Sequence, residues 1–239
     1  MNIEFAIIAA GEGARLKEEG ISLPKPMVPL CGTPMIERLI RIFANQGATQ
    51  VHVLINSKSQ ELADFLHTTA FGVPVYTTIE DTPSSLHSLY ALTRFNPAWE
   101  SCVLTTTDTI FSESDFEMYL QGFKDSKSCD AYMGVTDFVD DESPLFVKVS
   151  DTMEVSGFYD RNEGALSYVS AGIYGLKRKA MDCVEKSVAQ GDSRMRNYQR
   201  SLIDNGLNVE AHLFGKVVDV DHIADITTAE AFLMLNNGK

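Results

Sequence analysis

The feature that most constrains the fold is a regular alternation of apolar runs and amphipathic segments along the first half of the chain. Residues 3–10 read IEFAIIAA, a continuous apolar run that ends at Gly11 and Gly13 and is typical of a strand buried on both faces. Repeated strand and helix units predict a mostly parallel sheet with helices on both faces. The other units of this half are strands at 51–56, 73–79 and 101–107 and helices at 34–46, 59–69, 84–95 and 114–123.

The first of these helices carries end signals as well as an apolar face. Thr33 is the expected N-cap, Pro34 occupies the first helical position, and Gly47 follows the last turn. The apolar face that we expect to meet the sheet comprises Ile36, Leu39, Ile40 and Phe43.

From residue 130 the rhythm changes to short β-rich pieces and then returns to helices. No linker, repeat or low-complexity tract interrupts the chain, so we predict one domain over residues 1–239. We assign it to the α/β class, as a doubly wound, mostly parallel sheet with a small β-rich insertion. The expected segments are β-rich pieces at 130–136, 145–150, 153–159 and 165–176, helices at 178–189 and 194–204, a strand at 209–214, the segment 217–221 and a last helix near 227–236.

The charge balance limits the classes of partner. Lys and Arg number 20 against 33 Asp and Glu, a formal net charge of −13, and such a surface repels a nucleic acid. A small phosphorylated ligand remains compatible with this charge, because a divalent cation can bridge carboxylates to phosphate oxygens.

The cysteines and the N-terminus indicate a cytoplasmic protein. Four cysteines show neither a C-x-x-C pair nor a metal-site spacing, so we expect reduced thiols and no zinc site. We find no signal peptide and no apolar stretch of about 18 residues, so no membrane partner is expected. The sequence does not fix the oligomeric state, and a homo-oligomer is compatible with it.

The loop after the first strand, GEGARL, is the first candidate for chemistry. In an open α/β sheet, ligands bind beyond the carboxyl ends of the strands, and two glycines there let backbone N–H groups approach a phosphate closely. A Rossmann fingerprint would need a third glycine at Leu16, and a P-loop would need Gly-Lys-Ser/Thr, so neither motif is present. Taken alone, the loop is equally typical of a plain turn.

Two basic side chains follow this turn. Lys25 lies between Pro24 and Pro26, which hold the local backbone extended, and such an arm suits a phosphate clamp. The fork of Arg15 suits two phosphate oxygens. Without further context, both are ordinary solvated residues.

Together these segments resemble the signature of the sugar-phosphate nucleotidyltransferases, G-x-G-x-R-L, then P-K-P-h and G-x-P-h-h, where h is apolar. The matching segments are AAGEGARL at 9–16 and LPKPMVPLCGTPMIERLI at 23–40. The resemblance continues with TTTDTIF at 105–111, SAGIYGL at 170–176 and VVDVDHIADITTAEAF at 217–232. It therefore covers most of the chain.

The resemblance implies roles for particular residues. It places Mg²⁺ on Asp108 and on a second carboxylate, either Asp219 or Asp221, with Asp219 the better match to the family pattern. Alone, Asp108 is equally typical of a turn at a strand end, and the other two of solvent-facing strand residues. The catalytic pair would be Lys25 and Arg15. The nucleotide would contact Ala10, Gly11, Gly13, Arg15 and Ser85, and the acceptor Gly172.

Two departures from the family pattern concern the acceptor. A glycine-rich loop before the third helix is replaced by TPSSLHSL, which is similar to the Ser-rich segment of phosphocholine cytidylyltransferases. The E-K-P segment, whose lysine holds the sugar phosphate, is replaced by SGFYDRNEG, in which Arg161 is the candidate substitute.

The resemblance implies a Mg²⁺-dependent transfer of a nucleoside monophosphate from an NTP to a sugar 1-phosphate or similar acceptor, with release of pyrophosphate. Residues 1–128 would mainly bind the NTP and residues 129–239 mainly the acceptor. A phosphocholine-type cytidylyltransferase and a catalytically silent regulatory relative remain alternatives. A nicotinamide-dependent oxidoreductase is disfavoured because the third glycine is absent.

Overall fold

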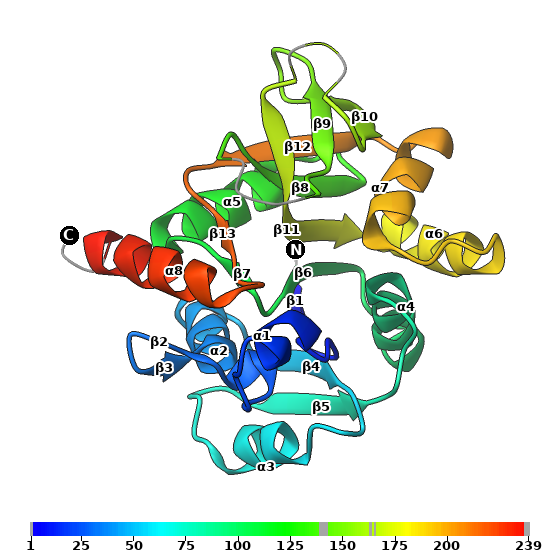
Figure 1. Cartoon of the computed structure of the whole chain (residues 1–239). Helices are drawn as coiled ribbons and strands as arrows, with labels where there is room; N and C mark the ends of the chain where they lie inside the picture. The colour runs from blue at the N-terminus through cyan, green and yellow to red at the C-terminus, as the bar shows by residue number, and fades with distance from the viewer. Residues whose placement is uncertain (1, 139–142, 163, 165, 237–239) are drawn as a thin grey trace.

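Figure 1 shows a computed structural model of the chain, which describes residues 2–138, 143–162, 164 and 166–236. The first half builds a parallel core in the strand order β5–β4–β1–β6. The chain runs outward from β1 to β5 and then crosses back to β6 on the other side of β1. The strand order therefore reverses next to β1. These strands are β1 (Glu4–Ile8), β4 (Val51–Ile55), β5 (Val75–Ile79) and β6 (Ser101–Thr106).

The second half extends the same sheet from β6. The long strand β11 runs antiparallel to both β6 and β8, and β12 closes this edge parallel to β8. The hairpin of β9 and β10 joins the beginning of β11, where β6 no longer reaches. The added strands are β8 (Ala131–Thr136), β9 (Phe146–Val149), β10 (Val155–Tyr159), β11 (Tyr168–Lys177) and β12 (Val209–Phe214).

Helices cover both faces of this sheet, and each face has its own apolar core. One core joins the sheet to α2 (Met35–Asn45), α3 (Gln60–Thr68) and α5 (Glu113–Asp125). The other joins it to α4 (Ser85–Phe95), α6 (Arg178–Ala189) and α7 (Met195–Asp204). The central strands β1, β4 and β6 are therefore buried on both faces, which explains their continuous apolar runs in the sequence.

A third apolar cluster brings the two ends of the chain together beside the sheet. The last helix, α8 (Ile223–Asn236), packs through Phe232 and Leu233 against Leu16 and the β2–β3 hairpin. A short ladder of β13 with β7 connects this cluster to the loop after β6. The remaining elements are α1 (Ala14–Glu18), the 3₁₀ turn η1 (Lys25–Met27), β2 (Pro29–Leu30), β3 (Thr33–Pro34), β7 (Thr109–Ile110) and β13 (Val218–Asp219).

The predicted α/β class, with a doubly wound sheet and a β-rich addition in the second half, is confirmed, although β11 makes the second half mixed rather than parallel. The predicted capping of α2 is wrong. Thr33 and Pro34 pair with the preceding strand as β3, and the helix begins at Met35, because the Pro34 backbone is extended with φ −53° and ψ 139°.

Smaller differences concern one short helix that the sequence did not predict and the ends of several other elements. The turn after β1 contains the five-residue helix α1, which buries only Leu16 and is too short to show a period. The last helix begins at Ile223 rather than near residue 227, and the strand expected at 73–79 begins at Val75. The β-rich piece expected at 165–176 is β11, and its residue 165 lies outside the described residues.

Candidate active site

Two adjoining pockets open at the carboxyl ends of β1 and β6, where the strand order reverses. The first, here called the loop pocket, is bounded by the turn after β1, by η1 and by the start of α4. The second, here called the β11 pocket, lies over β11 and the start of α7 and has a volume of about 340 Å³. Three residues line both pockets and mark their junction: Ser85, Thr106 and Asp108.

Gly11 and Gly13 have different structural roles in the turn. Gly13 has φ +62°, and a Cβ built there would lie 2.7 Å from the Cβ of Lys25. Only glycine therefore lets the turn approach Lys25 so closely. A Cβ on Gly11 would meet nothing within 4 Å, so this glycine leaves open space in the loop pocket.

Lys25 stands at the centre of a cluster of four charges. Its Nζ donates to Asp108 Oδ2 at 2.5 Å and to Asp221 Oδ1 at 2.6 Å. Arg15 Nη1 donates to the other oxygen of Asp221, Oδ2, at 2.6 Å. The structure thus brings together four residues that lie 10 to 206 positions apart in the sequence.

The pKa shifts follow from this pairing. Lys25 is only 8% exposed, and burial by itself would lower the pKa of its ammonium, but Asp108 and Asp221 outweigh burial and raise it. Burial by itself would raise the pKa of Asp108, but the Lys25 charge and hydrogen bonds from Lys25 and Thr106 hold it below the usual value. Both groups are therefore charged at neutral pH. Removing either partner would leave the other as an unpaired buried charge.

The two terminal aspartates lie in different places. Asp221 lines the loop pocket and shares Lys25 with Asp108, and its backbone N–H donates to Asp225 in the first turn of α8. Asp219 belongs to β13, which pairs with β7, and its exposed side chain lines the β11 pocket. Asp219 and Asp221 therefore lie in different pockets, one on each side of the junction. Asp225 has a structural role, because its carboxylate accepts hydrogen bonds from the backbone N–H groups of Asp221 and His222.

A divalent cation fits the donor set at this junction. The carboxylates of Asp108 and Asp221 already converge on one cationic atom, Lys25 Nζ. Within the described residues, no cluster of three or more His, Cys, Asp or Glu side chains could hold a metal ion. Mg²⁺ commonly takes one or two protein carboxylates and completes its shell with phosphate oxygens and water, so the two carboxylates suffice.

The β11 pocket depends on a bulge in its central strand. The register of β11 against β8 shifts between Ser170 and Tyr174, and Gly172 in the bulge has φ +72°. A Cβ at Gly172 would lie 2.7 Å from Thr109 Oγ1. The glycine therefore keeps β11 close to the junction and lines the pocket, and its contact with the acceptor stays a prediction.

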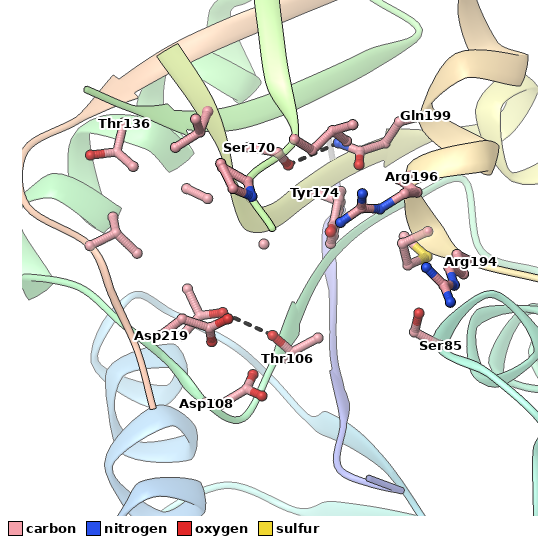
Figure 2. A pocket seen from close by; sticks show the side chains of 18 of the residues that line it. Ser85, Thr106, Asp108, Thr136, Ser170, Tyr174, Arg194, Arg196, Gln199 and Asp219 are labelled. Carbon is pink, nitrogen blue, oxygen red and sulfur yellow. Dashed lines mark hydrogen bonds between the residues drawn. The ribbon is translucent and has the colours of Figure 1, made fainter. Parts of the chain in front are cut away.

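Two arginines of the β11 pocket were missed by the sequence analysis. Arg194 and Arg196 precede and begin α7 and lie on the side of the pocket near Ser85 (Figure 2). Arg196 also pairs with Asp160 at 2.7 Å. Arg161, the residue expected to replace the missing lysine, is exposed after β10 and lines neither pocket. The R-M-R spacing at a helix start was the available signal.

The remaining nucleotide-side residues line the loop pocket. Ala10 follows β1, and its backbone oxygen accepts a hydrogen bond from the buried Asn56 side chain at 2.8 Å. Ser84 caps α4, accepting from the backbone N–H of His87, and so presents Ser85 at the junction. The structure therefore gathers every residue predicted to contact nucleotide, acceptor or metal at the two pockets, except Arg161.

The fold is a doubly wound sheet with a glycine turn after β1, and carboxylates from the loops after β6 and β13 converge on Lys25. These features place the molecule in the nucleotidyltransferase class of α/β proteins. More particularly, the chain belongs to the family of the MobA-like NTP transferase domain, whose model matches residues 5–164.

Named relatives agree with this assignment. A protein of Oryza sativa subsp. japonica named "Probable mannose-1-phosphate guanylyltransferase 1" is 28% identical over 208 residues, which are 84% of this chain and 56% of that protein. The bifunctional protein GlmU of Methanococcus maripaludis strain C7 is 23% identical over 95% of this chain and 53% of its own length. The chain spans about half the length of the curated relatives it matches.

A solved structure supports the fold over the whole chain. The inositol-1-phosphate CTP transferase from T. maritima has a TM-score of 0.82 to this structure at 18% identity, over 98% of this chain and 95% of that one. In the part of the chain that the structure describes, no helix is both long and apolar enough to cross a membrane.

Proposed function

We propose that this chain transfers a nucleoside monophosphate from an NTP to a sugar 1-phosphate, with Mg²⁺ as cofactor and pyrophosphate as the second product. The observation that carries the proposal is the Lys25 cluster at the junction of two pockets. One pocket has a glycine turn suited to phosphates, and the other has room for a small acceptor. The reacting groups would meet at the junction, where Asp108 lines both pockets.

The loop pocket is suited to the NTP. The turn at Gly11 and Gly13 offers backbone N–H groups, and Arg15 and Lys25 offer charged donors for the phosphate oxygens. Ala10 and Ser85 line the same pocket, from the end of β1 and the start of α4, and would contact the nucleoside. As the triphosphate enters, Lys25 and Arg15 would exchange their carboxylate partners for phosphate oxygens.

The acceptor needs orientation rather than a general base. A phosphate monoester has its second pKa at about 6, so it is mostly a dianion at neutral pH and can attack directly. One of its oxygens forms a bond to the α-phosphorus, the bond from the α-phosphorus to the bridging oxygen breaks, and pyrophosphate leaves with that electron pair. Arg194 and Arg196 supply positive charge in the acceptor pocket.

The bound metal would neutralise charge that develops on the phosphates during this transfer. Asp108 and Asp221 would hold it, and Asp219, on the acceptor side of the junction, is the second candidate for the terminal ligand. Lys25 would remain close enough to stabilise the same phosphates. The net charge of −13 requires such compensation before a polyanionic substrate can bind.

The direct test is pyrophosphate release from each of the four NTPs with Mg²⁺, against a panel of sugar 1-phosphates and phosphocholine. We expect release that depends on one class of acceptor, that EDTA abolishes, and that Asp108→Asn or Lys25→Ala reduces by orders of magnitude in kcat with the fold intact. Release with phosphocholine alone would favour the cytidylyltransferase. Nucleotide binding without release across the whole panel would favour the silent relative.

The same assay distinguishes the two terminal carboxylates. Asp221→Asn removes a group that shares Lys25 with Asp108, so we expect a loss of kcat similar to that of Asp108→Asn. Asp219→Asn is the matched control from the neighbouring strand, and we expect a smaller loss. A larger loss in Asp219→Asn would assign the metal to Asp219 instead.

A further inference from the structure

Gln199 is a buried polar side chain that the proposed mechanism does not use. It lies in α7, its relative exposure is 1%, and it lines the β11 pocket at the end away from Asp108 (Figure 2). Burial of an amide is costly unless its donors and acceptor find partners. The buried position of Gln199 in the pocket wall therefore calls for a functional reason.

The amide is held in one orientation. Its Nε2 donates to Ser170 Oγ of β11 at 2.9 Å, across the interface of helix and strand. This bond directs the carbonyl oxygen, Oε1, toward the cavity (Figure 2). Among the described residues, no hydrogen bond reaches Oε1. The wall thus presents one fixed acceptor without a donor.

A carbonyl oxygen accepts only from a ligand that carries an O–H or N–H group. We propose that Gln199 is a specificity-determining residue, whose Oε1 accepts a hydrogen bond from a hydroxyl group of the acceptor and so favours an acceptor with a hydroxyl at that position over a phosphorylated quaternary amine. This inference rests on the proposed function and adds one residue to its second pocket.

The other groups of the pocket support the same preference. The two hydroxyls of the wall have protein partners: Ser170 Oγ accepts from Gln199 Nε2, and Thr136 Oγ1 donates to the backbone oxygen of Gly215 and accepts from the backbone N–H of Phe138. The carboxylates that line the pocket, Asp108 and Asp219, lie at the junction, where the acceptor phosphate must react (Figure 2). A quaternary ammonium group bound away from the junction would find no carboxylate among the lining residues and would lie near the cations of Arg194 and Arg196.

The test compares binding of a hexose 1-phosphate with binding of its singly deoxygenated analogues, by titration calorimetry in the presence of a non-hydrolysable NTP and Mg²⁺. The wild-type chain is expected to lose about tenfold in affinity for the one analogue that lacks the hydroxyl read by Gln199. Gln199→Leu is expected to bind the parent compound about tenfold more weakly and to bind that analogue no differently from the parent.

Two further variants make the result specific. Ser170→Ala removes the partner that orients the amide, so it should weaken the same discrimination while leaving the buried carbonyl in place. Gln190→Leu, at the exposed end of α6, is the matched control and should retain wild-type selectivity. Thermal unfolding of each variant verifies that the chain is folded, and the KM for the NTP should not change.

The binding measurement separates this inference from the proposed function, because it needs no turnover. If the chain binds hexose phosphates but transfers nothing, the inference can hold while the transferase proposal fails. The inference is overturned if Gln199→Leu retains the discrimination between parent and analogues, or if the wild-type chain binds phosphocholine in preference to every hexose phosphate.

Discussion

Lys25 forms ion pairs with the two carboxylates that the proposed chemistry also assigns to a metal ion. Its ammonium lies 2.5 and 2.6 Å from Asp108 and Asp221. If the proposed metal binds these carboxylates, it would compete with the ammonium for the same oxygens. A bound triphosphate would offer Lys25 another anionic partner and so relieve that competition.

Removing the charge of Lys25 should make the carboxylates of Asp108 and Asp221 available to a metal ion. In Lys25→Met the two carboxylates lose their shared cation, so we expect the affinity for Mn²⁺ without nucleotide to rise about tenfold or more, measured by electron paramagnetic resonance of free Mn²⁺. Lys17→Met, an exposed lysine of α1, is the matched control. Equal Mn²⁺ affinities of wild type and Lys25→Met would show that the ammonium does not compete.

The two glycines of the turn provide a second comparison between single residues. Gly13→Ala places a Cβ 2.7 Å from Lys25 and forces a left-handed backbone, so we expect it to cost about 1–2 kcal/mol or more in the free energy of unfolding. Gly11→Ala meets nothing within 4 Å and should change stability little. Urea denaturation of both variants measures the difference, and equal losses would contradict the assigned role of Gly13.

At the scale of elements, β4 carries a buried titratable group in a strand that positions the site only indirectly. His52 is 7% exposed and lies against Trp99 and Tyr76, with ring centroids 4.9 and 5.5 Å away. Burial lowers the pKa of His52, and the neighbouring carboxylate of Glu4 only partly opposes this effect. The folded chain therefore binds a proton at this histidine less readily than the unfolded chain does.

This shift predicts a pH dependence of stability. Because the folded pKa lies below the unfolded value of about 6.5, the contribution of His52 is fully present above that pH and is lost as pH falls toward the folded value. Urea denaturation at pH 7.5, 6.5 and 5.5 should show this decline, and His52→Phe should reduce it. His67→Gln, on the exposed side of α3, is the matched control and should retain the wild-type slope.

The elements also show what the sequence could predict. The hydrophobic pattern located the strands of the parallel core and the helices that cover it. For β1, β4 and β6 the reason is burial on both faces, which requires apolar residues at successive positions. It missed α1, which buries only Leu16, and it misplaced the start of α2, because the pairing of Thr33 with Leu30 depends on a hairpin rather than on local propensity.

The site was predictable where a motif is local and was not where it depends on distant contacts. Gly13, Arg15 and Lys25 follow one strand closely, so their proximity could be expected. The pairing of Lys25 with Asp221, rather than Asp219, depends on how β13 pairs with β7. The R-M-R spacing indicates a pair of cations at a helix start, but their position at the β11 pocket depends on how α7 packs over the sheet.

At the scale of the whole molecule, one sheet runs through both halves of the chain. β11 lies between β8 and β6, and its last five residues pair with β6 of the first half. Each pocket draws on both halves, because Asp221 lines the loop pocket and Asp108 the β11 pocket. The division of substrates between residues 1–128 and 129–239 stays a prediction, whereas the two halves share one structural framework.

This framework predicts that the halves do not fold separately. A fragment of residues 1–128 lacks β11, so β6 would expose an unpaired edge and its apolar face would lose α6 and α7. We expect poorly dispersed amide signals in its NMR spectrum and no cooperative unfolding, in contrast to the full chain. A well-dispersed spectrum of the fragment would instead indicate two independent domains.

The return of α8 to the N-terminal hairpin has a consequence for synthesis on the ribosome. Lys25 is translated 196 positions before Asp221, whose loop is fixed by the first turn of α8. A nascent chain that has emerged only as far as β12 therefore holds the ammonium without one of its two counter-charges. The four-charge cluster can form only after β13 and the start of α8 have been synthesised, so the order of synthesis delays a charged site that the first half of the chain begins.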